Sequence, residues 1–161
     1  MAEPPPGYTI RHATQSDLPS VIRINRATLP ENYHPSFFED HLKKWGRAFY
    51  VAERDGEVVG YIMCRVEWGF GFKAKGLVKK GHVISIAVLP EHRRKGLGRA
   101  LMLRAMDSLK REYGAEEVYL EVRVSNRPAI ALYEKLGFEK TRVLHMYYLD
   151  GEDAYLMARK L

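Results

Sequence analysis

The sequence contains a single cysteine, Cys64, among 161 residues. One cysteine cannot form a disulfide within the chain, which favours a reducing compartment, and we expect a cytoplasmic protein. No apolar run approaches the ~20 residues that a membrane-spanning helix needs. The first residues, "MAEPPPGY", carry an acid and three prolines and have the features of neither a signal peptide nor an anchor. We expect a flexible tail over residues 1–7 and a single domain over residues 8–161.

Acidic residues are fewer than basic ones. The chain has 20 Asp and Glu against 26 Lys and Arg, so the formal net charge is +6. A basic balance favours anionic partners such as nucleic acid, a phosphorylated cofactor or an anionic surface, without choosing among them. Hydrophobic residues make up 46% of the chain, which is enough for one sizeable core in a protein of this length.

Hydrophobic patterning predicts alternating strands and helices. Strands are expected at 8–13, 81–89 and 116–124, helices at 16–29, 35–46, 96–112 and 125–137, a hairpin around Asp55-Gly56, a Gly and Lys loop at 68–80, and two strands around Asp150-Gly151. The order β-α-α-β-β-β-α-β-α-β-β predicts an α/β (α+β) domain with a mixed sheet.

The stretch "RRKGLGRAL", residues 93–101, lies between an apolar run and a long amphipathic segment. Its glycines are compatible with a tight turn alone. A dinucleotide fingerprint is disfavoured because Leu101 occupies the third glycine position, and no Gly-Lys-Ser/Thr of a P-loop occurs. A pyrophosphate cradle accounts for both glycines and charge, because backbone N–H groups at a helix start attract an anion and basic side chains neutralise it.

Several motifs in order resemble the GNAT acyltransferase superfamily. "RRKGLG" is similar to its acetyl-CoA loop, "GHVISIAVLPEHR" to the strand before that loop, and "VSNRPAIALYEKLGFEK" to the motif after it. "LPENY", "LEVRVSN" and "YYLDGEDAYLM" narrow the resemblance to protein N-terminal acetyltransferases, near the catalytic subunit of the N-terminal acetyltransferase A complex and its archaeal relatives. The resemblance covers nearly the whole chain. It implies the acyl-CoA N-acyltransferase fold and direct acetyl transfer from acetyl-CoA to a protein α-amine, through a tetrahedral intermediate.

The resemblance also implies a site for acetyl-CoA. Backbone N–H groups near the end of the preceding strand would stabilise the oxyanion, and the basic glycine stretch would hold the pyrophosphate. The implied cofactor-binding residues are Ile86, Ala87, Val88, Arg93, Arg94, Lys95, Gly96, Leu97, Gly98, Arg99, Asn126, Tyr133 and Lys135.

Three side chains are candidates for proton transfer. The substrate α-ammonium, with a pKa of about 8, must lose a proton before it can attack. The resemblance places His82 and Glu121 at the amine as a shared base, acting directly or through a water, and Tyr133 as the acid for the leaving sulfur. A His and a carboxylate could also hold a metal, but only two ligands are visible and the reaction requires none.

Five residues resemble the walls of a narrow slot for a free N-terminus. They are Leu29, Glu31 and Tyr33 between the first two helices, and Tyr147 and Tyr148 on the last hairpin. Glu31 is expected to set selectivity by attracting the ammonium or by crowding a large first side chain. The implied partners are protein or peptide N-termini, with no auxiliary subunit required and no membrane. Association with the ribosome and the preferred first residues stay open.

Two other functions stay open. A GNAT enzyme that acetylates a lysine or a small amine would carry the same cofactor motifs. A basic nucleic-acid-binding protein would use the basic runs at 73–80 and 93–99, but no recognised DNA- or RNA-binding motif occurs, so no specific nucleic acid is expected.

Overall fold

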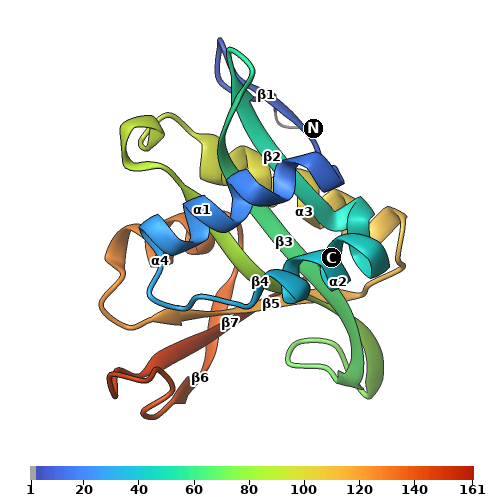
Figure 1. Cartoon of the computed structure of the whole chain (residues 1–161). Helices are drawn as coiled ribbons and strands as arrows, with labels where there is room; N and C mark the ends of the chain where they lie inside the picture. The colour runs from blue at the N-terminus through green and yellow to red at the C-terminus, as the bar shows by residue number, and fades with distance from the viewer. Residues whose placement is uncertain (1–2) are drawn as a thin grey trace. The chain divides into compact units, whose positions relative to one another are not determined.

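The computed structural model describes residues 3–161. Of the expected N-terminal tail, residues 1–2 lie outside the described residues, and the backbone N–H of Tyr8 donates to the carbonyl of Pro5 at 3.1 Å. Over the described residues, seven strands form one mixed sheet in the order β1-β2-β3-β4-β5-β7-β6 (Figure 1). Apart from three short 3-10 helices, the elements follow the predicted order β-α-α-β-β-β-α-β-α-β-β. The expected α/β fold class is confirmed.

The chain divides into two compact units. The first runs to Arg65 and includes Val83–Tyr113, and the second comprises Val66–His82 and Gly114–Leu161. The strands β3 (Glu57–Phe70) and β4 (Leu77–Val88) each contribute residues to both units.

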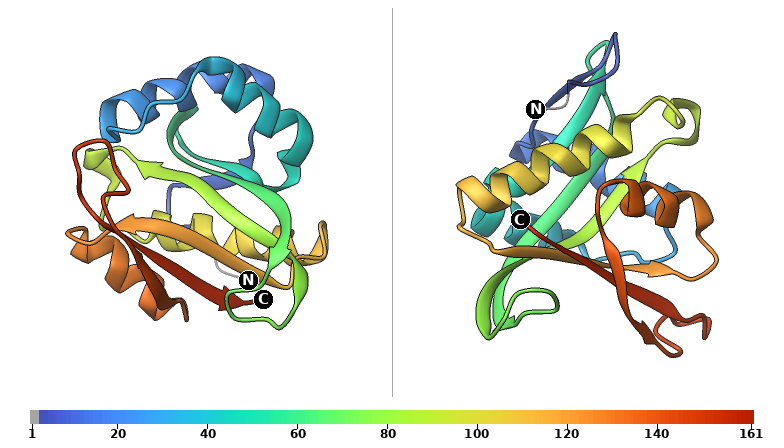
Figure 2. Two further views of the ribbon diagram at one scale, coloured as in Figure 1. Left: turned by 90° about the horizontal axis from the view of Figure 1, so that it is seen from below. Right: turned by 180° about the vertical axis from the view of Figure 1, so that it is seen from behind.

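Two layers of helices enclose the strands of the first unit. Figure 2 shows α1 and α2 on one side of β2 and β3, with α3 on the other. Besides its parts of β3 and β4, this unit contains β1 (Thr9–His12), η1 (Gln15–Asp17), α1 (Leu18–Thr28), α2 (Pro35–Trp45), η2 (Gly46–Ala48), β2 (Phe49–Arg54), η3 (Pro90–His92) and α3 (Leu97–Arg111).

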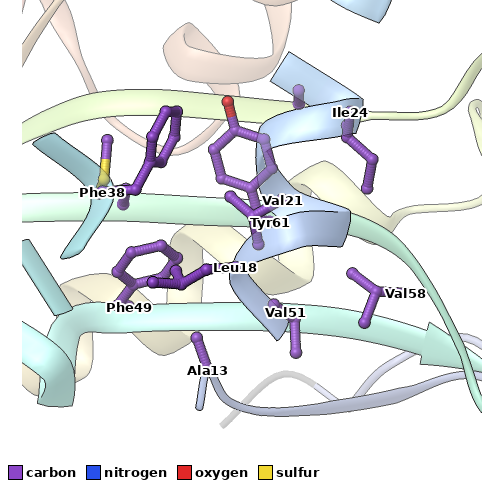
Figure 3. Close-up of a cluster of buried hydrophobic side chains, with 11 residues drawn as sticks. Ala13, Leu18, Val21, Ile24, Phe38, Phe49, Val51, Val58 and Tyr61 are labelled. Carbon is purple, nitrogen blue, oxygen red and sulfur yellow. The ribbon is translucent and has the colours of Figure 1, made fainter. Parts of the chain in front are cut away.

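The core of the first unit follows from helical and strand periodicity. Leu18, Val21 and Ile24 recur at helical spacing, so they lie on one face of α1. Phe49 and Val51 alternate along β2 and point to the same face of the sheet. These side chains meet in one buried cluster (Figure 3), which also contains Ala13, Phe38, Val58, Tyr61, Met63 and Ala87. The cluster attaches α1 and α2 to the sheet.

The second unit is built on a parallel strand pair. Besides its parts of β3 and β4, it contains β5 (Glu117–Arg123), α4 (Arg127–Lys135), β6 (Glu139–Leu144) and β7 (Ala154–Lys160). β4 runs parallel to β5, with Lys80 opposite Glu117 and His82 opposite Tyr119. β7 is antiparallel to both β5 and β6, and its Leu156 and Ala158 pack with Tyr119 in a smaller apolar cluster.

The expected loop over residues 68–80 is wrong at both ends. β3 continues to Phe70, and β4 begins at Leu77 rather than at residue 81. The connection stays short because a fully buried carboxylate, that of Glu117, accepts three consecutive backbone N–H groups, those of Phe72, Lys73 and Ala74, at 2.8, 3.0 and 2.9 Å. Glu117 lies more than forty residues from this turn, so the Gly and Lys composition of residues 68–80 does not indicate the interaction.

The two strands expected around Asp150-Gly151 are present, but the connection between them is long. β6 ends at Leu144 and β7 begins only at Ala154, so a nine-residue connection, 145–153, joins them. Arg123 holds this connection, because its Nη1 lies 2.9 Å from carboxylate oxygens of both Asp150 and Glu152.

Cys64 is fully buried in β3, and burial raises the pKa of its thiol. A buried thiol with a raised pKa is a core residue rather than a nucleophile. Within residues 3–161, no helix is long and apolar enough to cross a membrane.

We predict that Glu117→Gln destabilises the protein. A glutamine offers one oxygen acceptor in place of two, so at least one of the three N–H groups loses its partner, at a cost of about 1–3 kcal/mol. A thermal melt should show the midpoint lowered by roughly 2–10 °C. Glu116→Gln is the matched control, because the neighbouring Glu116 is exposed. Equal midpoints for the two variants would show that the carboxylate of Glu117 does not hold the turn.

Candidate active site

His82 lies between two carboxylates in the second unit. Its side chain is 10% exposed, its Nε2 lies 2.8 Å from Oε1 of Glu121, and its Nδ1 lies 2.9 Å from Oε2 of Glu67. The parallel register explains the first contact: His82 is opposite Tyr119, and Glu121 follows two residues later on the same face of β5. The structure thus brings together the two residues predicted to share the role of base.

Glu67 was not among the predicted site residues. It lies near the end of β3, where one of its carboxylate oxygens accepts the hydroxyl hydrogen of Tyr119 and the other contacts His82. The rings of His82 and Tyr119 stack with centroids 4.0 Å apart and an interplanar angle of 17°. The available signal was a single acid in the run "YIMCRVEW". Because a loop was expected from residue 68, the contact between Glu67 and His82 was not predicted.

Burial and the two carboxylates act on His82 in opposite directions. Burial alone would lower the pKa of the imidazole, whereas the hydrogen bonds and charges of Glu121 and Glu67 raise it, and the net result is a pKa above the ordinary value. In the part of the chain that the structure describes, no group of three or more His, Cys, Asp or Glu side chains is arranged to hold a metal ion.

The predicted pyrophosphate cradle lies in the first unit, where α3 begins. Gly96 is the N-cap of α3 and has φ +89°, and Arg94 has φ +61°. These left-handed residues turn the chain sharply into the helix. A Cβ placed on Gly96 would meet no atom within 4 Å, so the backbone here is open to a ligand. The positive end of the helix dipole, the open backbone and the exposed cations nearby are the features of a site that binds a phosphate group.

The side chains of the cradle do not all face outward. Arg94, Lys95 and Arg99 are exposed, and Gly98 is half-buried. Leu97 is buried, so only its backbone is available to a ligand. Arg93 is exposed, but its Nε donates to the carbonyl of Val88 at 2.8 Å, which ties the loop to the end of β4.

The other predicted cofactor residues lie on β4 and α4. Ile86 and Val88 are half-buried and Ala87 is buried, all in the part of β4 that belongs to the first unit. In the second unit, Asn126 caps α4 by accepting the backbone N–H of Ala129 at 3.3 Å.

Tyr133 and Lys135 lie on α4. Tyr133 is 7% exposed, and burial raises the pKa of its hydroxyl to about 12. The hydroxyl is therefore neutral at physiological pH and able to donate a hydrogen bond. Lys135 is exposed at the last position of the helix.

The predicted substrate segment of the first unit is anchored through its backbone. Nδ2 of the fully buried Asn25 donates to the carbonyl of Glu31 at 3.1 Å, and Nδ2 of Asn32 donates to that of Leu29 at 2.8 Å. Tyr33 stacks on Phe37 with ring centroids 4.5 Å apart. The half-buried Glu31 therefore occupies a defined position, although sequence reasoning did not identify the asparagines that fix it.

The predicted substrate tyrosines of the second unit lie in the connection between β6 and β7. Tyr147 and Tyr148 form an edge-to-face pair with centroids 5.0 Å apart. The guanidinium of Arg123 lies 4.0 Å from the ring centroid of Tyr148. Arg123 thus orders both the connection and one of its tyrosines. That Glu31 and these tyrosines form opposite walls of one slot stays a prediction.

Comparison with known proteins identifies the family. The model of the acetyltransferase (GNAT) family matches residues 18–138. The chain belongs to this family. It is 60% identical over 156 residues to the N-alpha-acetyltransferase of Saccharolobus solfataricus, covering 96% of this chain and 93% of that protein. It is 41% identical over 154 residues to the N-terminal acetyltransferase A complex catalytic subunit NAA10 of Arabidopsis thaliana. The match covers 94% of this chain and 77% of that protein.

A solved GNAT structure has the same fold. The crystal structure of Ard1 from Thermoplasma volcanium superposes with a TM-score of 0.82 at 35% identity, over 96% of this chain and 98% of that one. The predicted GNAT membership and fold are confirmed, and the protein is an acetyltransferase.

We predict that Gly96→Val weakens acetyl-CoA binding at least tenfold, or about 1.4 kcal/mol, as measured by calorimetry. A branched side chain would fill the open space over the backbone where phosphate oxygens approach. Gly151→Val is the matched control for strain, because Gly151 has φ +90° and equally open surroundings. If both variants bind as tightly as the wild type, the cradle does not hold the pyrophosphate.

Proposed function

We propose that this protein is an N-alpha-acetyltransferase, which transfers the acetyl group of acetyl-CoA to the α-amine of a protein N-terminus. The observation that carries the proposal is the pair of His82 and Glu121, 2.8 Å apart. The pair occurs in a chain 60% identical to a protein named for this activity.

The chemistry divides among the residues as follows. When bound, acetyl-CoA supplies an acetyl group activated as a thioester. The N–H groups around Gly96 and the cations of the loop hold its pyrophosphate. Glu121 accepts a proton from the substrate ammonium, directly or through a water. The amine then attacks the acetyl carbon, the new C–N bond forms, the C–S bond breaks, and the departing sulfur takes up a proton.

Tyr133 acts at the departing sulfur. Its hydroxyl has a pKa of about 12, whereas an ordinary thiol has one of about 8.5. A phenol that is a weaker acid than the thiol stays protonated and stabilises the thiolate by a hydrogen bond. The proton that finally neutralises the sulfur comes from the amine, whose second proton is lost as the amide forms.

Several further features belong to this proposal. Protein or peptide N-termini are its partners, with the 29–33 segment and Tyr147 and Tyr148 as the peptide site. The protein acts in the cytoplasm without an auxiliary subunit. The relative NAA10 is named as a subunit of a complex. Sedimentation of the active protein alone, and with ribosomes, distinguishes a free enzyme from an assembled one.

The experiment that tests the function compares acceptors. We expect acetylation of peptides with a free α-amine and none of a matched peptide whose N-terminus is blocked and whose only amine is a lysine. Glu121→Gln should lower kcat at least a hundredfold, within the range of general base catalysis, and leave acetyl-CoA affinity unchanged. Acetylation of the lysine alone would support the alternative, a GNAT lysine or small-amine acetyltransferase.

We predict that Glu31→Val shifts selectivity toward large first residues. Burying a methionine side chain against an ionised carboxylate forfeits part of the ~1.5–3 kcal/mol that burial provides. The ratio of kcat/KM for Met-starting over Ser-starting peptides should rise about tenfold in a competition assay, and the rate on Ser-starting peptides should fall. Asp40→Val, on the exposed side of α2, is the control. An unchanged ratio would place the peptide entrance elsewhere.

A further inference from the structure

Both ring nitrogens of His82 are engaged by carboxylates. A general base needs a nitrogen with a free lone pair directed at the substrate. Here Nδ1 contacts Glu67 at 2.9 Å and Nε2 contacts Glu121 at 2.8 Å. An ionised carboxylate only accepts hydrogen bonds, so two such partners require an N–H on each nitrogen. The arrangement therefore fits the imidazolium rather than the neutral ring.

Glu67 is an acceptor at both oxygens. Tyr119 donates its hydroxyl hydrogen to Oε1, which leaves Oε2 to accept from Nδ1 of His82. Hydrogen bonds donated to a carboxylate favour its ionised form. The near-parallel stack of Tyr119 on His82, 4.0 Å between centroids, places a π face against the ring and adds to the stability of a cation.

Two cations, Lys80 and Arg142, lie over the aromatic rings beside this group. Nζ of Lys80 lies 5.0 Å from the centroid of Tyr119 and 4.0 Å from that of Phe72, and its hydrogen bond goes to the carbonyl of Phe70. Arg142 lies over the far ring, that of Phe72. These cations disfavour an imidazolium, but Glu67 and Glu121 contact it directly. Opposite Glu121, β7 presents the apolar Leu156.

We propose that Glu67 is a positioning residue that keeps His82 protonated, and that this imidazolium orients Glu121, which alone accepts the proton of the substrate amine. The inference rests on the proposed function. It separates the two residues predicted to share one role: His82 supplies a fixed positive charge, and Glu121 is the base. It differs from a carboxylate–histidine–nucleophile arrangement, in which the outer nitrogen stays free to accept a proton.

The direction of a pH shift tests the proposal. In Glu67→Gln, the imidazole loses one anionic partner, so its pKa falls. If the imidazolium is required, kcat/KM should decline at high pH in the variant, with a descending limb about one pH unit or more below that of the wild type. If neutral His82 is the base, the same lowered pKa would instead move the ascending limb to lower pH. The second pattern, or a uniform loss of rate with no shift, overturns the proposal.

Tyr119→Phe is the matched control variant. It keeps the stacked ring and the charge of Glu67 and removes only the hydroxyl. We expect its descending limb to stay within about 0.3 pH units of the wild type, because the charge partner of His82 is retained. A shift as large as that of Glu67→Gln would mean that the hydroxyl, rather than the carboxylate charge, controls His82, and would overturn the assignment of Glu67.

A second measurement does not depend on turnover. Nitrogen-15 NMR of the imidazole reports how many ring nitrogens carry a proton, and the signal that disappears in His82→Gln identifies His82 among six histidines. We expect both nitrogens protonated in the wild type at pH 7.5, and a lower titration midpoint in Glu67→Gln. A neutral ring in the wild type overturns the proposal even if Glu67→Gln fails to fold. If neither the wild type nor any variant acetylates a free α-amine although the imidazolium is present, the proposed function is refuted instead.

Discussion

The short parallel pairing of β4 with β5 is the constraint on which the candidate active site depends. Only with His82 opposite Tyr119 do the imidazole, the stacked phenol and the carboxylate of Glu121 share one face of the sheet. A slip by one residue would turn Glu121 to the other face. The register is itself supported by Glu117, whose backbone pairs with Lys80 while its side chain holds the turn before β4. Structural support and chemistry thus come from alternate residues of the same strand.

Much of the fold could be predicted because its signals are local. Helical spacing of Leu97, Leu101, Ala105 and Leu109 predicted α3, and all four side chains are buried. Glycine at the start of that helix predicted a sharp turn, and the left-handed φ of Gly96 agrees with it. The element order followed from such segments, so the fold class did not require any knowledge of distant contacts.

The parts that sequence reasoning missed depend on polar contacts between distant residues. Glu67 and His82 are fifteen residues apart, and Arg123 and Asp150 are twenty-seven apart. Each of these side chains looks like an ordinary surface charge until the strands are paired. Glycine and lysine at 68–80 suggested a loop, and Asp150-Gly151 marked the connection between two strands without its length. Local composition carries no information about a buried carboxylate or a guanidinium that fixes the backbone.

The proposed cofactor site and the proposed base use charge in different ways. The cations of the loop, Arg94, Lys95 and Arg99, are exposed, and salt at physiological concentration screens such charges beyond about 8 Å. His82 and its carboxylates are largely withdrawn from water, where interactions between charges are stronger and a lost partner costs more. One exposed cation can therefore substitute for another with little effect on the cradle. The proposed roles of the open backbone at Gly96 and of the carboxylates beside His82 allow no such exchange, because each depends on atoms in fixed positions. In the proposed site, specificity for the cofactor therefore rests on backbone geometry, and reactivity rests on the contacts of His82 with Glu67 and Glu121.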